Sequence, residues 1–265
     1  PVNKPDIEDS VATHLMGAIG SAEHRILVQT PYLVLTEAAM TLFEMRRDAV
    51  EVKIHTNSLA STDNWASYAH AMRQRYEVIE SLQIDVREIK PYPAHIADIA
   101  PWRTAESDGP LLSMHAKSMV IDKDLAVIGS YNLDPRSEVL NSEVLLAVWD
   151  EAFAARLAID IERDCRPENS WVVAPKIRPL PTALVLSLIE GVNAAVKQVT
   201  TFDLWPIQSC ALFEITPGAE PESRFEAGFY EQYRDVGLFP DVSTARDLIL
   251  VQLARSLTGV FRSQI

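Results

Sequence analysis

Residues 114–122 read Met-His-Ala-Lys-Ser-Met-Val-Ile-Asp, and this stretch decides how the fold and the chemistry of the chain are interpreted. Its apolar residues predict a β-strand over residues 114–121, followed by a turn over residues 122–124. Residues two apart on a strand project from the same face, so we expect the imidazole of His115 beside the ammonium of Lys117. Phosphoryl transfer uses such a pair, because the histidine serves as nucleophile or acid while the fixed charge binds the non-bridging oxygens of the phosphate.

A second polar pair follows one predicted hairpin later. Residues 125–130 are predicted to form a strand that runs into the sequence Gly-Ser-Tyr-Asn at residues 129–132. Ser130 and Asn132 are again two residues apart, so their hydroxyl and amide groups are expected to project together. Together with the first pair, these groups can cradle a phosphate without a metal ion.

A carboxylate opens the next predicted strand, which covers residues 143–149. If Glu143 accepts a hydrogen bond from one ring nitrogen of His115, it fixes the tautomer of the ring and stabilises its cationic form, as a triad acid does. Asp122 follows Lys117 by five residues and is therefore expected on the opposite face of the strand. We assign Asp122 a structural role in an ion pair.

The separate fragments of this pattern are common in proteins that have no such site. A histidine two residues before a lysine is typical of exposed strands, and serine or asparagine near glycine is typical of turns. The combination is far more specific. His-x-Lys-x4-Asp is followed by Gly-Ser-Tyr-Asn, then by Asp-Pro-Arg-Ser at residues 134–137 and Asn-Ser-Glu at residues 141–143. We therefore interpret these segments as one phosphodiester-binding site.

Helices and strands alternate upstream of this site. Thr36 is a candidate cap for one helix, residues 61–63 offer caps for a longer one, and Asp150 is a candidate cap for a helix that ends near Cys165. Residues 90–112 contain four prolines and predict a long loop. This alternation predicts an α/β fold with a mixed sheet flanked by helices. The predicted helices upstream of the site are 6–22, 37–47 and 61–82, and the predicted strands are 25–30, 50–55 and 84–89.

A proline-rich stretch at residues 166–181 indicates a boundary. Residues 1–165 are expected to form the α/β domain, and residues 166–265 a connection and a mostly helical C-terminal extension to which the sequence assigns no role. Within the extension we predict helices over residues 184–198 and 243–261.

Composition argues against several classes of function. The net charge is −13 and no stripe of Lys and Arg is present, which disfavours a nucleic-acid partner. Cys165 and Cys210 lack the spacing of a metal site or a disulfide framework, so neither a metal nor a cofactor is expected. The longest apolar stretch, residues 181–196, is too short to span a bilayer. The chain opens at Pro1 rather than Met, which indicates an excised fragment.

The motif over residues 115–122 resembles the HKD motif of the phospholipase D superfamily. The sequence of residues 129–143 resembles the second HKD repeat of bacterial cardiolipin synthases, particularly the C-type branch. The sequences Thr-Pro-Tyr at residues 30–32 and His-Thr-Asn-Ser-Leu-Ala-Ser-Thr-Asp at residues 55–63 also fit that branch. The resemblance covers residues 1–165 well and the remaining residues with much less specificity.

The resemblance implies a two-step reaction in which one histidine attacks the phosphodiester and a histidine of a second HKD motif protonates the leaving alcohol. By this resemblance His115 is the motif histidine, Lys117 and Asn132 contact the phosphate, Ser130 is the supporting hydroxyl and Glu143 orients the histidine. Three further residues are expected to brace the site: Arg136, Ser137 and Asn141.

Such enzymes use two HKD motifs, and this sequence contains one. The second half-site is therefore expected from an upstream part of the same protein or from a homodimer. The resulting hypothesis is a cardiolipin synthase-like phosphatidyltransferase or phosphodiesterase that acts on phospholipids at a membrane surface, namely the bacterial inner membrane or its cytoplasmic side. Two alternatives remain open, a homodimeric HKD nuclease or other phosphodiesterase, and a non-catalytic structural or docking half. The acceptor alcohol, the donor headgroup and the identity of the attacking histidine also stay open.

Overall fold

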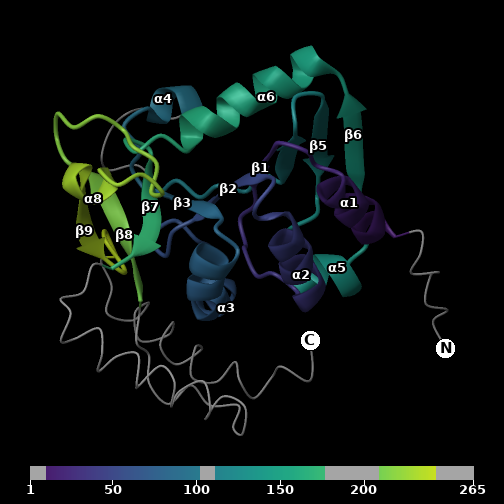
Figure 1. Cartoon of the computed structure of the whole chain (residues 1–265), viewed down its shortest axis with the longest axis horizontal. Helices are drawn as coiled ribbons and strands as arrows, with labels where there is room; N and C mark the ends of the chain where they lie inside the picture. The colour runs from purple at the N-terminus through teal and green to yellow at the C-terminus, as the bar shows by residue number, and fades with distance from the viewer. Residues whose placement is uncertain (1–9, 102–110, 177–208, 243–265) are drawn as a thin grey trace, which may run out of the picture.

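The computed structural model describes residues 10–101, 111–176 and 209–242 (Figure 1). The strands in these residues form one nine-stranded sheet with the order β6-β5-β4-β1-β2-β3-β7-β8-β9. The strands are β1 (Arg25–Gln29), β2 (Glu51–Asn57), β3 (Asp85–Ile89), β4 (Ser118–Ile121), β5 (Leu125–Gly129), β6 (Leu145–Trp149), β7 (Ser170–Pro175), β8 (Cys210–Ile215) and β9 (Tyr233–Gly237).

The sheet is mixed. Strands β1, β2 and β3 run parallel to one another, whereas β4, β5 and β6 on one side and β7, β8 and β9 on the other pair antiparallel. The predicted α/β fold with a mixed sheet flanked by helices is thus confirmed. The helices are α1 (Val11–Gly20), α2 (Glu37–Arg46), α3 (Trp65–Tyr76), α4 (Ile96–Ile99), α5 (Pro135–Val139), α6 (Glu151–Asp164) and α8 (Phe229–Gln232), with a π-helical turn (Glu77–Ser81) after α3.

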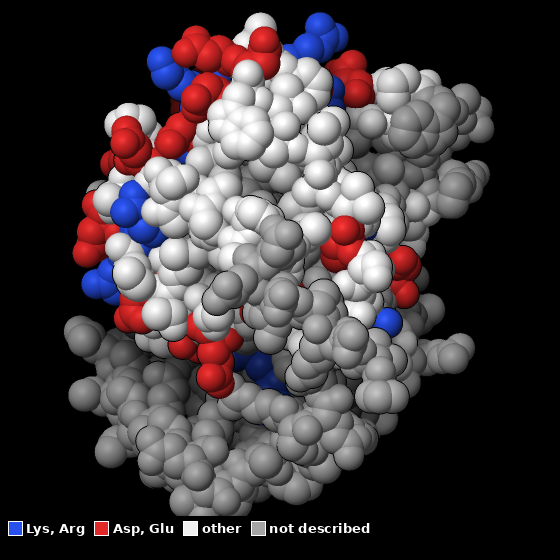
Figure 2. Space-filling view, turned by 90° about the vertical axis from the view of Figure 1, so that its right-hand side faces the viewer, with Lys and Arg blue, Asp and Glu red and all other residues white. Residues whose placement is uncertain are grey.

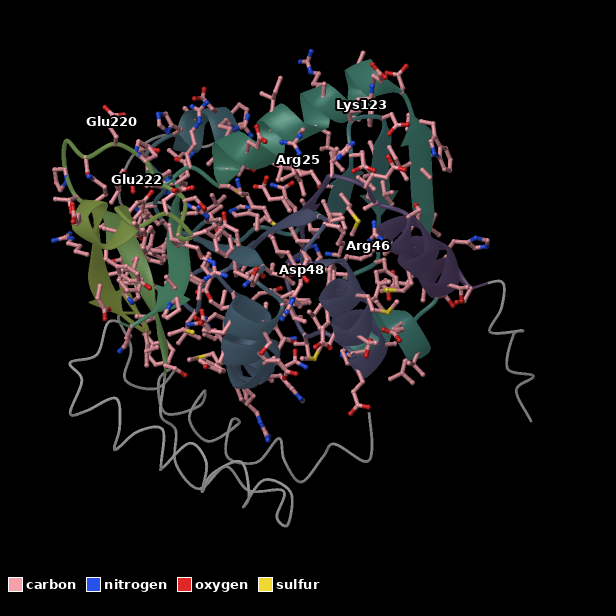
Figure 3. All side chains as sticks on the ribbon, viewed as in Figure 1. Arg25, Arg46, Asp48, Lys123, Glu220 and Glu222 are labelled. Carbon is pink, nitrogen blue, oxygen red and sulfur yellow. The ribbon has the colours of Figure 1, made fainter. Side chains whose placement is uncertain are left out.

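The two faces of the sheet are covered by different helices, as Figure 1 shows with α6 above the sheet and α1, α2 and α3 below it. Helix α6 packs small side chains such as Ala154 and Ala158 onto Leu27 of β1 and Ala126 of β5. Arg25, the first residue of β1, forms an ion pair with α6, and Figure 3 shows its side chain beneath that helix. The opposite face carries the larger core, which includes residues of α1 and α2 and strands β1–β5, β7 and β8.

Two of the expected helix caps are present. The Thr36 side chain accepts from the amide of Ala39 at the start of α2, and the Asp150 side chain accepts from the amide of Phe153 at the start of α6. A side-chain acceptor at this position satisfies one of the amides that a helix leaves unpaired at its first turn.

The cap expected among residues 61–63 is wrong, because α3 begins later and Asn64 caps it by accepting from the amide of Ser67. The earlier candidates have other partners. The Ser61 hydroxyl donates to the carbonyl of Ile89, and the carboxylate of Asp63 accepts from the hydroxyl of Tyr32. The side chains of Ser61 and Asp63 are thus engaged in tertiary contacts, and Asn64 serves as the cap.

The strand expected over residues 114–121 is shorter than predicted, because β4 begins at Ser118. Its neighbour β1 ends at Gln29, which pairs with Ser118, and the chain then turns away at Thr30-Pro31. Residues 114–117 thus have no β1 neighbour to pair with, and proline itself carries no amide hydrogen to offer. Strand β6 likewise begins at Leu145 rather than at residue 143.

The proline-rich stretch predicted as a boundary contains β7, which pairs antiparallel with β3. Strands β8 and β9 extend the sheet beyond β7, so the described residues after 165 contribute three strands and the short helix α8. The division into a domain over residues 1–165 and an extension over residues 166–265 stays a prediction. The helices expected over residues 184–198 and 243–261 lie outside the described residues. Residues 90–101, in the expected loop, include the short helix α4.

Candidate active site

His115 and Lys117 lie next to each other just before β4, in backbone that belongs to no strand. The prediction that one strand carries both is therefore wrong, but their side chains do converge. The Lys117 Nζ atom is 3.2 Å from Nδ1 and 3.1 Å from Nε2 of His115, and 3.1 Å from the carbonyl oxygen of His115. An atom almost equidistant from both ring nitrogens lies off both lone-pair directions. The cation therefore lies against the ring of His115, whose side chain is exposed.

The charge of Lys117 is set by opposing influences. Burial lowers the pKa of Lys117, and the carboxylates of Asp63, Glu143 and Asp134 offset part of that effect. The pKa therefore lies below its ordinary value. Three carboxylates around one ammonium mean that the site is not a simple concentration of positive charge.

Glu143 is held by hydrogen bonds from the loop that precedes it and from the end of β5. The Ser130 hydroxyl donates to Oε2 of Glu143 and accepts from the amide of Val144 at 3.0 Å, and the Asn141 amide donates to Oε1 of Glu143 at 3.0 Å. Burial raises the pKa of Glu143, but hydrogen bonds from Ser130, Ser137 and Asn141 and the charge of Lys117 outweigh it. The pKa is thus lowered, and Glu143 is an anion at neutral pH.

Gly129 allows Ser130 to reach this position. A Cβ atom at Gly129 would collide with the carbonyl oxygen of Val144, so β5 and β6 approach closely only because no side chain is present there. The glycine of the motif thus brings the serine hydroxyl to Glu143.

The expected contact between Glu143 and His115 is not made in the described part of the chain. Both carboxylate oxygens of Glu143 accept from other groups, and the hydrogen-bond contacts of His115 are with Lys117. The orienting role of Glu143 stays a prediction. In this structure Glu143 acts on the site through Ser130 and through the charge of Lys117.

Asn132 is buried at the entry to α5. Its backbone amide donates to the hydroxyl of Ser137 at 3.1 Å, and the amide of Ser137 donates to Asp134, the cap of α5, at 2.8 Å. The side-chain oxygen of Asn132 has no partner within the described residues. A half-turn about the Cβ–Cγ bond exchanges this oxygen with the NH2 group, so the same position can present a donor to a phosphate oxygen.

The other residues expected to support the site divide into two groups. Ser137 and Asn141 contact it directly, as described above. Arg136 has an exposed side chain, and its carbonyl oxygen accepts from the amide of Asn141 at 2.8 Å. Arg136 thus shapes the loop before Glu143 through its backbone.

Asp122 has a structural position of a different kind from the expected ion pair. It adopts a left-handed conformation with φ of 54°, and its carboxylate accepts from the backbone amides of Glu23, His24 and Arg25. Burial raises the pKa of Asp122, but these three amides and the charge of His24 lower it further than burial raises it. Asp122, the aspartate of the HKD motif, thus connects the turn between β4 and β5 to the start of β1 through hydrogen bonds.

Tyr32 and Asp63 fall in the stretches 30–32 and 55–63 that resemble the family, but the sequence alone assigned neither residue a role in the site. The ring of Tyr32 meets the ring of His115 edge-on, with 6.3 Å between centroids. The Tyr32 hydroxyl donates to Asp63 at 2.7 Å, and burial together with Asp63 raises the pKa of Tyr32 to about 12. A third residue that the residue pattern alone did not indicate, Asn57 at the end of β2, contacts the backbone before His115.

Within the described residues no group of three or more His, Cys, Asp or Glu side chains is arranged to hold a metal ion. In the same residues no helix combines the length and the apolar composition needed to cross a membrane.

Known relatives share this region of the chain. Cardiolipin synthase C of Escherichia coli (strain K12) is 33% identical over 141 residues, which are 53% of this chain and 29% of that protein. Cardiolipin synthase A of Pseudomonas aeruginosa (strain LESB58) is 26% identical over 160 residues, which are 60% of this chain and 28% of that protein. The chain thus spans less than a third of the length of these curated relatives.

Solved structures with a similar arrangement include a phospholipase D family member, Nuc from Salmonella typhimurium. It is 21% identical, with a TM-score of 0.44 over 61% of this chain and 90% of that one. The family model described as "Cardiolipin synthase, PLD-like domain" matches residues 15–165, which contain every residue of the site described above. The chain therefore belongs to the family of cardiolipin synthase, phospholipase D-like domains.

Proposed function

We propose that this chain provides one half-site of a phosphatidyl-transferring enzyme that acts on phospholipids, in the manner of a cardiolipin synthase. The observation that carries the proposal is the approach of the Lys117 ammonium to the His115 ring beside the anchored Glu143–Ser130 pair. A nucleophile with a cation beside it is what a phosphodiester needs for attack and charge stabilisation. The side-chain amide of the buried Asn132, whose oxygen has no partner within the described residues, is the further group that we assign to the phosphate.

In the proposed reaction a ring nitrogen of His115 attacks the phosphorus and the bond to the leaving alcohol breaks. The leaving oxygen takes a proton from a histidine of the second half-site. An acceptor alcohol then gives its proton to that histidine and attacks the phosphorus, and the phosphorus–nitrogen bond to His115 breaks. Lys117 and Asn132 hold the non-bridging oxygens throughout. With the roles of the two histidines exchanged, His115 would be the proton donor.

The second half-site is required by the leaving group. An alkoxide leaves poorly, so cleavage at neutral pH needs a proton delivered in the transition state. The other five histidines of the sequence, at positions 14, 24, 55, 70 and 95, lack a lysine two residues later. We infer that another part of the same protein, or a second copy of the chain, supplies the proton.

The surface around the site supports such an assembly. Figure 2 faces the side that carries α1 and β6, where most of the described surface is uncharged and the acidic and basic side chains gather mainly at its edge. Large apolar side chains are exposed on β5, on β6, at the end of α5 and in the segment that leads from α5 to β6: Ile128, Val139, Leu140, Val144 and Leu146. Apolar surface of this kind marks interaction sites, and Val144 directly follows Glu143. The proposed substrate places the protein at a membrane surface, on the bacterial inner membrane or its cytoplasmic side.

The proposal is tested by giving the chain two substrates that differ in leaving group. Bis(p-nitrophenyl) phosphate releases p-nitrophenolate, which needs no proton, so we expect a burst of one equivalent and a p-nitrophenyl phosphoryl group bound through phosphorus to His115. Phosphatidylglycerol, with its alkoxide leaving group, should show little or no turnover by the chain alone. His115→Ala should abolish the burst, whereas His24→Ala, at an exposed histidine before β1, should retain it.

Three results would change the assignment. A burst that persists in His115→Ala would place the chemistry elsewhere. Robust turnover of phosphatidylglycerol that rises as the chain dimerises would replace the half-site by a homodimeric enzyme. Faster cleavage of nucleic acid than of phospholipid would favour the nuclease alternative, against the net charge of −13.

A further inference from the structure

The side chain of Asn57 bridges both polar groups of one backbone residue. Asn57 is the last residue of β2 and only 2% of its surface is exposed. Its Oδ1 atom accepts from the amide of Met114 at 3.0 Å, and its Nδ2 atom donates to the carbonyl of Met114 at 2.8 Å. The same Nδ2 atom is 3.4 Å from the carbonyl oxygen of Pro31.

This bridge replaces a missing strand neighbour. Strand β1 pairs with β4 only as far as Gln29 and Ser118, and the chain leaves the sheet at Thr30-Pro31. The backbone at Met114 is buried, and buried amide and carbonyl groups need partners. A carboxamide side chain offers one donor and one acceptor in the geometry of a peptide group, so Asn57 pairs with Met114 as a neighbouring strand would.

The bridge acts on the peptide that carries His115. The carbonyl of Met114 and the amide nitrogen of His115 belong to the same planar peptide unit. A hydrogen bond at that carbonyl therefore restrains the plane from which the Cα–Cβ bond of His115 projects. The His115 side chain itself is exposed and has hydrogen-bond contacts only with Lys117 among the described residues.

We propose that Asn57 is a positioning residue for His115, which it orients through the backbone of Met114. The inference rests on the proposed role of His115 in phosphoryl transfer and deepens it. Asn57 touches neither the substrate nor the reacting atoms. Asn57 increases the fraction of time for which the imidazole of His115 is correctly oriented. This orientation affects the rate strongly, because displacements of about 1 Å in a reacting group cost about 10²-fold in rate.

The experiment compares Asn57→Ala and Asn57→Ser with the parent chain. Serine keeps a polar group in the buried position but is too short to bridge both backbone groups of Met114. In each variant we expect faster hydrogen exchange of the Met114 amide and a changed His115 ring signal in the NMR spectrum. The p-nitrophenolate burst should slow by about 10–100-fold at saturating substrate, with the half-saturating concentration changed by less than about threefold.

Asn169→Ala is the matched control. Asn169 is also fully buried, and its side chain bridges the carbonyl of Arg163 and the amide of His95, away from the site. This variant should lose stability but keep the His115 signal and the burst rate within about twofold of the parent. All rates are compared under conditions in which each variant is folded, as judged by urea unfolding.

The outcomes distinguish the positioning role of Asn57 from the proposed function of the chain. An unchanged His115 signal and burst rate in Asn57→Ala, despite fast exchange at Met114, would overturn the positioning role. Equal slowing in Asn169→Ala would show that stability alone matters, and would also overturn it. If the parent shows no burst, the proposed function fails, and the His115 signal in the Asn57 variants still decides whether the bridge orients the ring.

Discussion

The Lys117 ammonium nitrogen lies 3.1 Å from Nε2 and 3.2 Å from Nδ1 of His115, although neither residue is part of a strand. The pair is therefore held by the local backbone before β4 and not by the alternation of a pleated sheet. Its place beside Glu143, whose charge contributes to the pKa of Lys117, links the two halves of the motif electrostatically.

Replacing Lys117 by methionine removes the cation and leaves a side chain of similar length. We expect the p-nitrophenolate burst to slow by about 10²–10³-fold, which is typical for loss of one group that stabilises developing negative charge. Lys117→Arg should restore only part of the rate, because the planar guanidinium presents its donors differently from an ammonium. The control is Lys123→Met in the β4–β5 turn, an exposed lysine that Figure 3 shows close to the start of α6. A parent-like rate in Lys117→Met would remove Lys117 from the phosphate contacts.

Glu143→Gln should lower the burst rate by roughly 10²–10⁴-fold with little effect on folding, as for other acids that support a catalytic histidine. Glutamine preserves the shape but removes the charge near Lys117 and the second acceptor for Ser130 or Asn141. Stopped-flow absorbance of p-nitrophenolate measures the effect. Glu151→Gln, at an exposed glutamate of α6, should leave the rate unchanged. A Glu143→Gln burst equal to that of the parent would exclude a supporting role for this carboxylate.

Asp122→Asn should destabilise the fold in a pH-dependent way. The pKa of Asp122 is depressed in the folded chain, so its contribution is present above the unfolded value of about 3.9 and is lost as pH falls through the folded value. Three amides contact a half-buried carboxylate, so we expect a loss of about 1 kcal/mol at pH 7 after screening by solvent. Urea unfolding should show this difference shrinking at the lowest pH that the parent tolerates. A constant difference over that range would mean that the carboxylate charge is irrelevant.

The burial of His55 leads us to expect that the folded chain loses stability in acid. His55 is a completely buried residue of β2, and Ser170 of β7 contacts its Nε2 atom at 3.0 Å. Burial together with Arg87 lowers its pKa to about 3. Because the unfolded chain binds a proton near pH 6.5 and the folded chain does not, stability should fall as pH drops from about 6.5 towards about 3. His55→Gln should remove about one proton from that slope, measured by urea unfolding across the range.

Local sequence signals determined the order of the elements and the identity of the motif. Strands β1, β2, β3, β5 and β6 and the helices α2 and α6 lie within a few residues of their predicted positions, because hydrophobic periodicity and caps such as Thr36 and Asp150 are local features. The convergence of His115 with Lys117 was likewise expected from spacing, although the reason given for it, a shared strand, is wrong.

Only the tertiary structure decided where those signals stop. Strand β4 begins at Ser118 because β1 leaves the sheet at Pro31, and no pattern within residues 114–121 reports the end of a neighbour. The pairing of β7 with β3 places part of the proline-rich stretch 166–181, which the sequence predicts as a boundary, in the same sheet as the upstream strands. The bridge from Asn57 to Met114 spans 57 positions of sequence. Such contacts depend on how folded segments meet, and local periodicity carries no information about partners that distant in the chain.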